Sequence, residues 1–232
     1  MSSSDWLAGV GILVSIALAI LTAFAAGPTL SIVLTAALLL LVIALAWYLY
    51  WRLHLPAYTV AELKMEFQIH DRAGNESTAR KTVVLRPNYP NLKEYVHKNF
   101  SSDGTATLVP DRRVNIVRSE SAAGQHGVTV AFDTPLKAFS RVATWLEWKL
   151  QGAFTGNPEA VVLTADQPIR AAVVEVTLPP DRPPQRAVVI RSYAGRQEEL
   201  APPRVDASRI TWACSRRWRG IPMGDYEIRW WW

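Results

Sequence analysis

The chain has 232 residues, a net charge of +5 and a single cysteine, Cys214. One cysteine excludes an intrachain disulfide, and a mild positive charge suits an anionic partner without requiring one. Half of the residues are hydrophobic, although the mean hydropathy is only +0.06. The apolar residues are concentrated at the N-terminus, where Asp5 and Arg52 are the only charged residues among the first 52.

Two long apolar runs open the chain, at residues 6–26 and 30–51. A helix rises about 1.5 Å per residue, so each run is long enough to cross the ~30 Å hydrocarbon core of a bilayer. The Gly27-Pro28-Thr29 break between them allows only an antiparallel connection. The sequence therefore predicts a transmembrane α-helical hairpin within residues 1–55, with the lipid bilayer as a partner.

Charged and aromatic residues beside the two runs predict an orientation. Arg52 and Lys64 lie on the side of both termini, whereas the connecting loop is uncharged. The positive-inside rule then places both termini and the following domain in the cytoplasm, at a bacterial inner membrane crossed twice. A cleaved signal peptide with a site at Ala23-Phe24-Ala25 is the alternative, and the lack of Lys or Arg in the first five residues argues against it.

Four small residues recur at every fourth position of the first run: Gly11, Ser15, Ala19 and Ala23. Small residues along one stripe let helix backbones approach closely. Two interpretations remain open. The stripe packs against the second helix of the same chain, or it joins several chains into a homo-oligomer.

After Pro56 the hydrophobic period changes to two. Residues 61–70 alternate between apolar and polar, which is typical of a half-buried strand, and turn residues at 71–75 predict a hairpin with residues 77–86. Further strands are predicted at 105–109, 114–118, 128–132, 160–164, 169–178, 186–193, 209–213 and 225–232. Residues 57–232 are therefore predicted to form an all-β soluble domain, sandwich or barrel-like, or two packed β units that divide near residue 155.

Three segments of this domain have more than one interpretation. Residues 92–99 are compatible with a short helix. Residues 140–151 fit a helix or a strand, and a strand is favoured because Leu146, Trp148 and Leu150 share one face. The last strand carries an aromatic face that either packs inward or stays exposed for a membrane interface or a partner: Tyr226, Ile228, Trp230 and Trp232.

No catalytic or metal-binding pattern is recognisable in the sequence. The histidines are scattered and lack ligand spacing: His54, His70, His97 and His126. Cys214 has no evident histidine partner. We therefore predict no metal, no cofactor, no catalytic residue and no enzyme, with a membrane-tethered enzyme as the third hypothesis for function.

A basic and aromatic segment precedes the last strand: Arg216, Arg217, Trp218 and Arg219. Guanidinium groups bind phosphates bidentately and an indole stacks on a base, so this segment is a candidate binding site for an anionic small molecule. The alternative is an ordinary solvated basic loop. Nothing in the sequence points to a nucleic acid polymer as a partner.

The order of elements, two N-terminal membrane helices and then a β-rich domain, resembles the two-TM, β-strand-rich membrane effectors of bacterial cyclic-oligonucleotide anti-phage systems. The resemblance covers the whole chain but includes no family motif. It implies that the β domain senses a nucleotide second messenger, such as a cyclic nucleotide, and that the helices multimerise and damage the inner membrane. The first hypothesis is thus a membrane-anchored sensor or effector of a defence or stress pathway, and the alternative is a non-catalytic docking or envelope protein.

Overall fold

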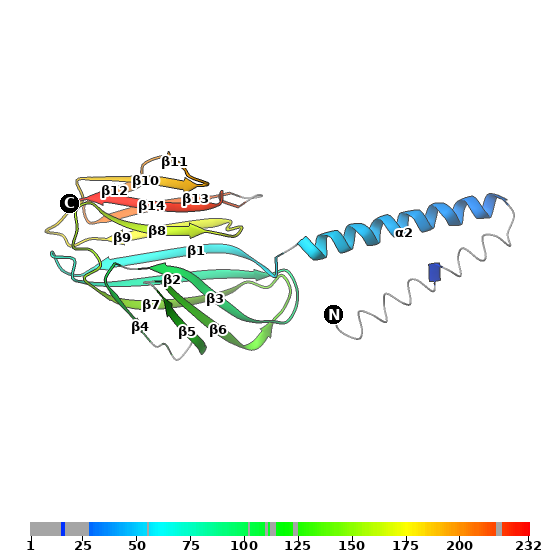
Figure 1. The fold of residues 1–232 in the computed structure, drawn as a ribbon, viewed down its shortest axis with the longest axis horizontal. Helices are drawn as coiled ribbons and strands as arrows, with labels where there is room; N and C mark the ends of the chain where they lie inside the picture. The colour runs from blue at the N-terminus through cyan, green and yellow to red at the C-terminus, as the bar shows by residue number, and fades with distance from the viewer. Residues whose placement is uncertain are drawn as a thin grey trace. The chain divides into compact units, whose positions relative to one another are not determined.

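A computed structural model of the chain describes residues 15–16, 28–54, 56–101, 103–109, 111, 115–122, 125–216 and 220–232. The chain divides into two compact units, Met1–Leu55 and Pro56–Trp232. Helix α2 (Pro28–His54) belongs to the first unit, and the described strands, β1 to β14, belong to the second (Figure 1).

The transmembrane hairpin predicted from the two apolar runs is wrong. In the described part of the chain, no helix combines the length and the apolar character needed to cross a membrane. The second run does form a helix, α2, but the first lies almost entirely outside the described residues, so no helical pair is described. A run of apolar residues shows only where a spanning helix could form. The two-pass orientation and the inner-membrane location depended on the hairpin and are corrected with it.

Only one member of the small-residue stripe is described. Ser15 lies in a short helical stretch with Ile16, whereas Gly11, Ala19 and Ala23 lie outside the described residues, as does the possible cleavage site. Packing through this stripe therefore stays a prediction. The described side chains of α2 include eight large exposed apolar groups: Ile32, Leu39, Leu40, Leu41, Val42, Ile43, Trp47 and Leu49.

The second unit is built from three sheets. The large sheet has the strand order β12–β13–β9–β1–β2–β7–β4, in which only β1 and β9 are parallel. Its strands are β1 (Tyr58–Ile69), β2 (Glu76–Pro87), β4 (Thr105–Val109), β7 (Val142–Gln151), β9 (Ala171–Thr177), β12 (Arg204–Asp206) and β13 (Arg209–Ser215). The four-stranded sheet, β11–β10–β14–β8, contains β8 (Glu159–Ala165), β10 (Arg186–Tyr193), β11 (Arg196–Glu199) and β14 (Gly224–Trp231). The three-stranded sheet, β3–β6–β5, contains β3 (Leu92–Ser101), β5 (Asn115–Ala122) and β6 (Gln125–Leu136).

The β1–β2 hairpin forms as predicted, and its turn shows why. The Asp71 carboxylate accepts hydrogen bonds from the backbone N–H of Asn75 at 2.8 Å and of Glu76 at 3.1 Å. Gly74 adopts a φ of 75°, and a Cβ atom there would lie 1.6 Å from the carbonyl oxygen of Phe154. Asp and Gly are therefore both required by the backbone at this turn.

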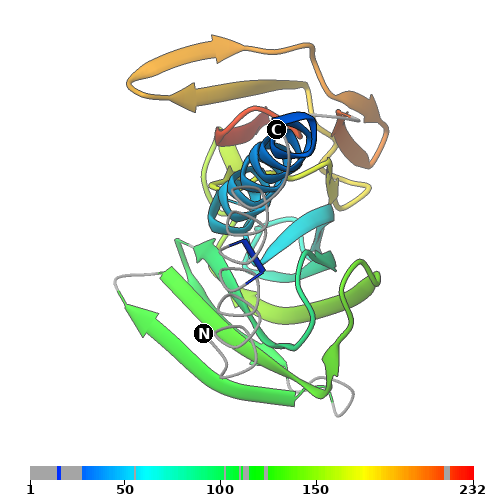
Figure 2. The ribbon, with the colours of Figure 1, turned by 90° about the vertical axis from the view of Figure 1, so that its right-hand side faces the viewer.

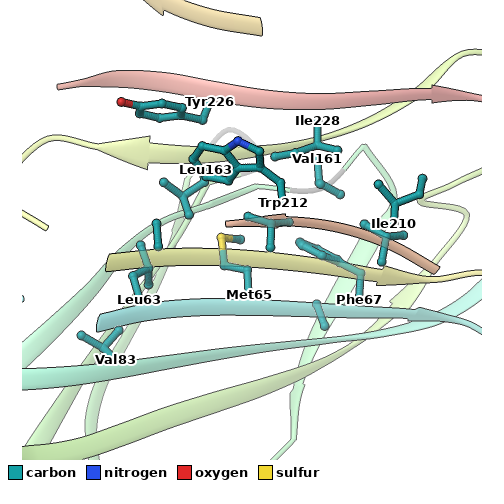
Figure 3. Packing of buried hydrophobic residues seen from close by; sticks show 14 of the residues in the cluster. Leu63, Met65, Phe67, Val83, Val161, Leu163, Ile210, Trp212, Tyr226 and Ile228 are labelled. Carbon is teal, nitrogen blue, oxygen red and sulfur yellow. The ribbon is translucent and has the colours of Figure 1, made fainter. Parts of the chain in front are cut away.

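Both smaller sheets cover the same face of the large sheet. Lys81 pairs with Met65 on one side and Leu146 on the other, so these three side chains share that face. Figure 3 shows Leu163, Tyr226 and Ile228 of the four-stranded sheet packed over β1, β9 and β13. The three-stranded sheet covers β2 and β7, and the β5–β6 and β10–β11 hairpins lie at opposite ends of the domain (Figure 2). The result is a two-layer sandwich whose second layer is split.

The three ambiguous segments are all strands. A helix over 92–99 is wrong, because buried Tyr95 and His97 alternate with exposed Val96 and Lys98 in β3. The strand favoured for 140–151 is confirmed as β7. The aromatic face of β14 packs inward, since its first three members are at most 1% exposed and only Trp232 is half-buried.

Candidate ligand-binding site

A cavity of about 40 Å³ lies where the two smaller sheets approach each other above β1 and β2. We call it the junction pocket. Its polar lining comes from four separate parts of the chain: Tyr58 of β1, Lys81 of β2, Tyr95 and Lys98 of β3, and Thr164, Asp166 and Gln167 at and after the end of β8. A water molecule needs roughly 10–15 Å³ of such volume, so the pocket holds two or three water-sized groups, such as the oxygens of one carboxylate or phosphate.

Lys81 is the most unusual residue of the pocket, because it is a lysine on the buried face of a central strand. Its side chain is 8% exposed, and its ammonium group donates a hydrogen bond to the Lys98 carbonyl oxygen at 2.5 Å. Burial lowers the pKa of Lys81 to about 8, and the Asp166 carboxylate opposes that shift. Among the described residues, no carboxylate forms an ion pair with Lys81. At neutral pH the pocket therefore contains the positive charge of Lys81, which the Asp166 carboxylate on the same wall offsets only in part.

Two phenol groups extend the polar wall beside Lys81. The rings of Tyr58 and Tyr95 meet edge to face, with their centroids 5.3 Å apart. Burial raises the pKa of both phenols, and hydrogen bonding with the Gln167 side chain opposes the shift. Both hydroxyl groups thus remain protonated at neutral pH and can donate hydrogen bonds.

A second buried polar pair, outside the pocket lining, lies between the three-stranded sheet and the large sheet. His97 is 1% exposed, and its Nε2 atom lies 3.4 Å from the hydroxyl oxygen of Thr144. Its Nδ1 atom has no hydrogen-bond partner within the described residues. Burial, and secondarily the charge of Lys81, lowers the pKa of His97 to about 3. The imidazole is therefore neutral under ordinary conditions, and Lys81 carries the positive charge of this region.

The structure places part of the predicted Arg/Trp segment near the pocket. Arg216 is exposed directly after β13, whereas Arg217, Trp218 and Arg219 lie outside the described residues. The two ends of the segment are fixed by backbone hydrogen bonds, from Arg216 N–H to the Arg170 carbonyl at 2.9 Å and from Ile221 N–H to the Ile169 carbonyl at 2.7 Å. Ile169 also lines the junction pocket. A binding role for the segment stays a prediction.

The cysteine, histidine and carboxylate side chains of the described residues form no metal-binding cluster. Cys214 is half-buried on β13, and no group of three His, Cys, Asp or Glu side chains in the described ranges is arranged to hold a metal ion. Sequence reasoning missed Lys81, although a signal was present. In β2 the inward positions are the odd-numbered ones, and Lys81 falls between Ala79 and Val83 in that series.

No family model matches the chain, and no curated protein is significantly similar to it. Solved structures of similar shape include the M1 zinc metallopeptidase from Deinococcus radiodurans, with a TM-score of 0.40 and 14% identity over 74% of this chain and 42% of the peptidase. A variant of a two-domain M1 zinc metallopeptidase bound to L-tryptophan matches with a TM-score of 0.41 and 13% identity, over 76% of this chain and 43% of the peptidase. The chain spans less than half the length of these peptidases. A likeness this weak supports no statement about activity.

Proposed function

We propose that the β domain is a ligand-binding module whose junction pocket holds one anionic group of a small molecule. The observation that carries this proposal is the position of Lys81, whose nearly buried charge borders a cavity and has no ion-pair partner among the described residues. Burying a charge without a partner costs several kcal/mol, so such a residue is usually kept for a role. An anionic ligand would supply the missing partner.

The neighbouring groups support the same class of ligand. The protonated hydroxyls of Tyr58 and Tyr95 can donate to the anion beside Lys81. Because the pocket has a volume of only about 40 Å³, the rest of the ligand would remain outside it. Arg216 offers further positive charge, since its backbone N–H bonds to Arg170, the neighbour of the pocket residue Ile169.

A ligand in this position would contact both smaller sheets at once, since β3 contributes Tyr95 and the end of β8 contributes Thr164. Binding would then stabilise the junction between the two sheets. A sensing role of the kind implied by the resemblance requires a part of the domain whose conformation or stability depends on the ligand, and the junction between the two sheets would be that part. The defence or stress pathway itself stays a hypothesis.

The test is isothermal titration calorimetry of the purified full chain with acetate, inorganic phosphate, AMP and a cyclic dinucleotide. We expect at least one anion to bind, with an affinity that falls as salt increases and as Lys81 loses its proton above about pH 8. Lys81→Met should weaken binding by roughly tenfold or more, because a charge-assisted hydrogen bond is lost. Lys93→Met, at an exposed site on β3, is the matched control. Equal affinity in the Lys81 and Lys93 variants would contradict the proposal.

A further inference from the structure

The outer face of the large sheet, opposite the core, carries two rows of polar side chains. Strand register places one row straight across four strands: Glu147 on β7, Arg80 on β2, Glu66 on β1 and Glu175 on β9. The next row includes Gln68 on β1 and Arg209 on β13. We call these six residues the polar platform.

A groove of about 320 Å³ crosses the polar platform, and all six platform residues line it. Phe67 is the one apolar residue of that lining. The volume is within the lower range of sites that hold small molecules or part of a polymer. The lining is far more polar than in a typical small-molecule site, so the ligand must be polar along its length.

The platform and its neighbours carry charges of both signs. The carboxylates of Glu66, Glu147 and Glu175 lie among the cations of Arg80, Arg209 and the adjacent Lys64 and Lys149. The Lys64 ammonium lies 2.9 Å from a Glu66 oxygen and 3.1 Å from a Glu175 oxygen. A surface with mixed signs gives no net attraction to a charged polymer, which argues against nucleic acid and against a polyanion.

The hydrogen-bonding groups match a polyhydroxylated ligand. Carboxylates only accept, guanidinium groups only donate, and the Gln68 amide does both. A hydroxyl group can therefore donate to one platform residue and accept from its neighbour on the next strand. Adjacent strands lie about 4.8 Å apart, so such pairs repeat at a spacing close to the length of one sugar ring.

An aromatic ring lies at one side of the platform. Trp145 precedes Glu147 by two residues on β7 and points to the same face. Its indole N–H donates to the Asp111 carboxylate at 3.2 Å, and the Arg80 guanidinium lies 5.6 Å from its ring centroid. The ring is thereby held in a fixed orientation, and the part of its half-buried surface that Arg80 leaves uncovered is apolar and suits the C–H face of a sugar.

We propose that the polar platform and Trp145 bind a neutral oligosaccharide, laid across β7, β2, β1 and β9 with one sugar against the indole. This site is separate from the junction pocket, which lies on the other face of the large sheet. The proposal therefore does not depend on the anionic ligand proposed above.

The test is affinity electrophoresis of the full chain through gels containing hydroxyethylcellulose, dextran or soluble starch, with titrations of cellohexaose, maltohexaose and chitohexaose. We expect retardation by at least one neutral polymer and binding of the matching hexasaccharide. Trp145→Ala and Glu147→Gln should each raise the dissociation constant roughly tenfold or more. Glu199→Gln, on the exposed strand β11, and Lys81→Met should leave it unchanged.

Circular dichroism and melting curves establish that each variant is folded, and Glu66→Gln replaces either platform variant that is not. Polygalacturonate and a single-stranded oligonucleotide are run as anionic comparators. Failure of all the neutral glycans to bind would overturn the proposal, as would binding to the anionic polymers alone. Unchanged affinity in folded Trp145→Ala and Glu147→Gln would also overturn it.

Discussion

Replacing Lys81 by methionine should stabilise the β domain at neutral pH. The pKa of Lys81 falls from 10.5 to about 8 on folding, a difference of about 2.5 units. Each unit corresponds to 1.36 kcal/mol, so burying the ammonium group costs roughly 3 kcal/mol at pH values below 8. Methionine fills nearly the same volume and carries no charge. It also removes the hydrogen bond to the Lys98 carbonyl, a loss of about 1–2 kcal/mol. The expected net gain is roughly 1–2 kcal/mol.

The pH dependence distinguishes this effect from a general packing improvement. Between pH 8 and 10.5 the unfolded chain keeps the Lys81 proton while the folded protein releases it. The unfolded state then binds more protons, so the stability of the wild-type protein increases with pH across this window. The methionine variant lacks that increase. Its advantage should be largest below pH 8, should fall to zero within this window, and should turn into a small disadvantage as pH 10.5 is approached, because the hydrogen bond to Lys98 is still missing.

Urea denaturation measures this directly, with intrinsic tryptophan fluorescence as the signal, at intervals from about pH 6 to pH 10.5. Lys93→Met, at an exposed position of β3, is the matched control and should change the free energy of unfolding by less than about 0.5 kcal/mol. A stability difference between wild type and Lys81→Met that stays constant over the whole range would refute the reasoning. So would an equal effect in the control.

Two further predictions use other features of the domain. The pKa of His97 falls from 6.5 to about 3 on folding. The unfolded chain therefore takes up a proton that the folded protein does not, and the free energy of unfolding of the wild type decreases by roughly 3 kcal/mol between pH 6.5 and about pH 4. His97→Phe should remove this decrease. An acid titration followed by fluorescence tests this, and identical midpoints for both proteins would contradict it. Gly74→Ala should destabilise by at least about 2 kcal/mol more than Gly195→Ala, since both glycines have a φ of 75° but only at Gly74 would the added Cβ atom lie 1.6 Å from a carbonyl oxygen. Equal melting temperatures for the two variants would show that the contact with Phe154 is unimportant.

The alternation of apolar and polar residues predicted most of the strands, because a strand with one buried face shows this pattern whatever it pairs with. The bounds of β4 and β10 agree with those expected from the sequence. β11 and β12 were not predicted, since all their residues are exposed and no alternation marks them. The parallel pairing of β1 with β9 joins segments about a hundred residues apart and leaves no local pattern.

The N-terminal prediction failed for a different reason. It rested on the length of two apolar runs and the break between them, and these features alone do not establish a helix that meets the requirements for spanning a membrane. The junction pocket was missed because its walls come from residues between Tyr58 and Ile169 that only the tertiary fold brings together. Of the pocket residues, only Lys81 could have been noticed in the sequence, because it is a charged residue at a position of β2 where the alternation predicts a buried side chain.

The two halves of the sandwich differ in the polarity of their buried contacts. Beneath the four-stranded sheet the contacts are made by large apolar and aromatic groups such as Phe67, Trp212 and Ile228 (Figure 3). Beneath the three-stranded sheet, buried Lys81, His97 and Thr144 lie on facing strands, and each desolvated polar group there reduces stability. Sequences usually break the rule of apolar interiors where a site requires it. If the proposed function is right, substitutions at the wall of the junction pocket in this polar half should weaken binding even where, as for Lys81→Met, they stabilise the fold.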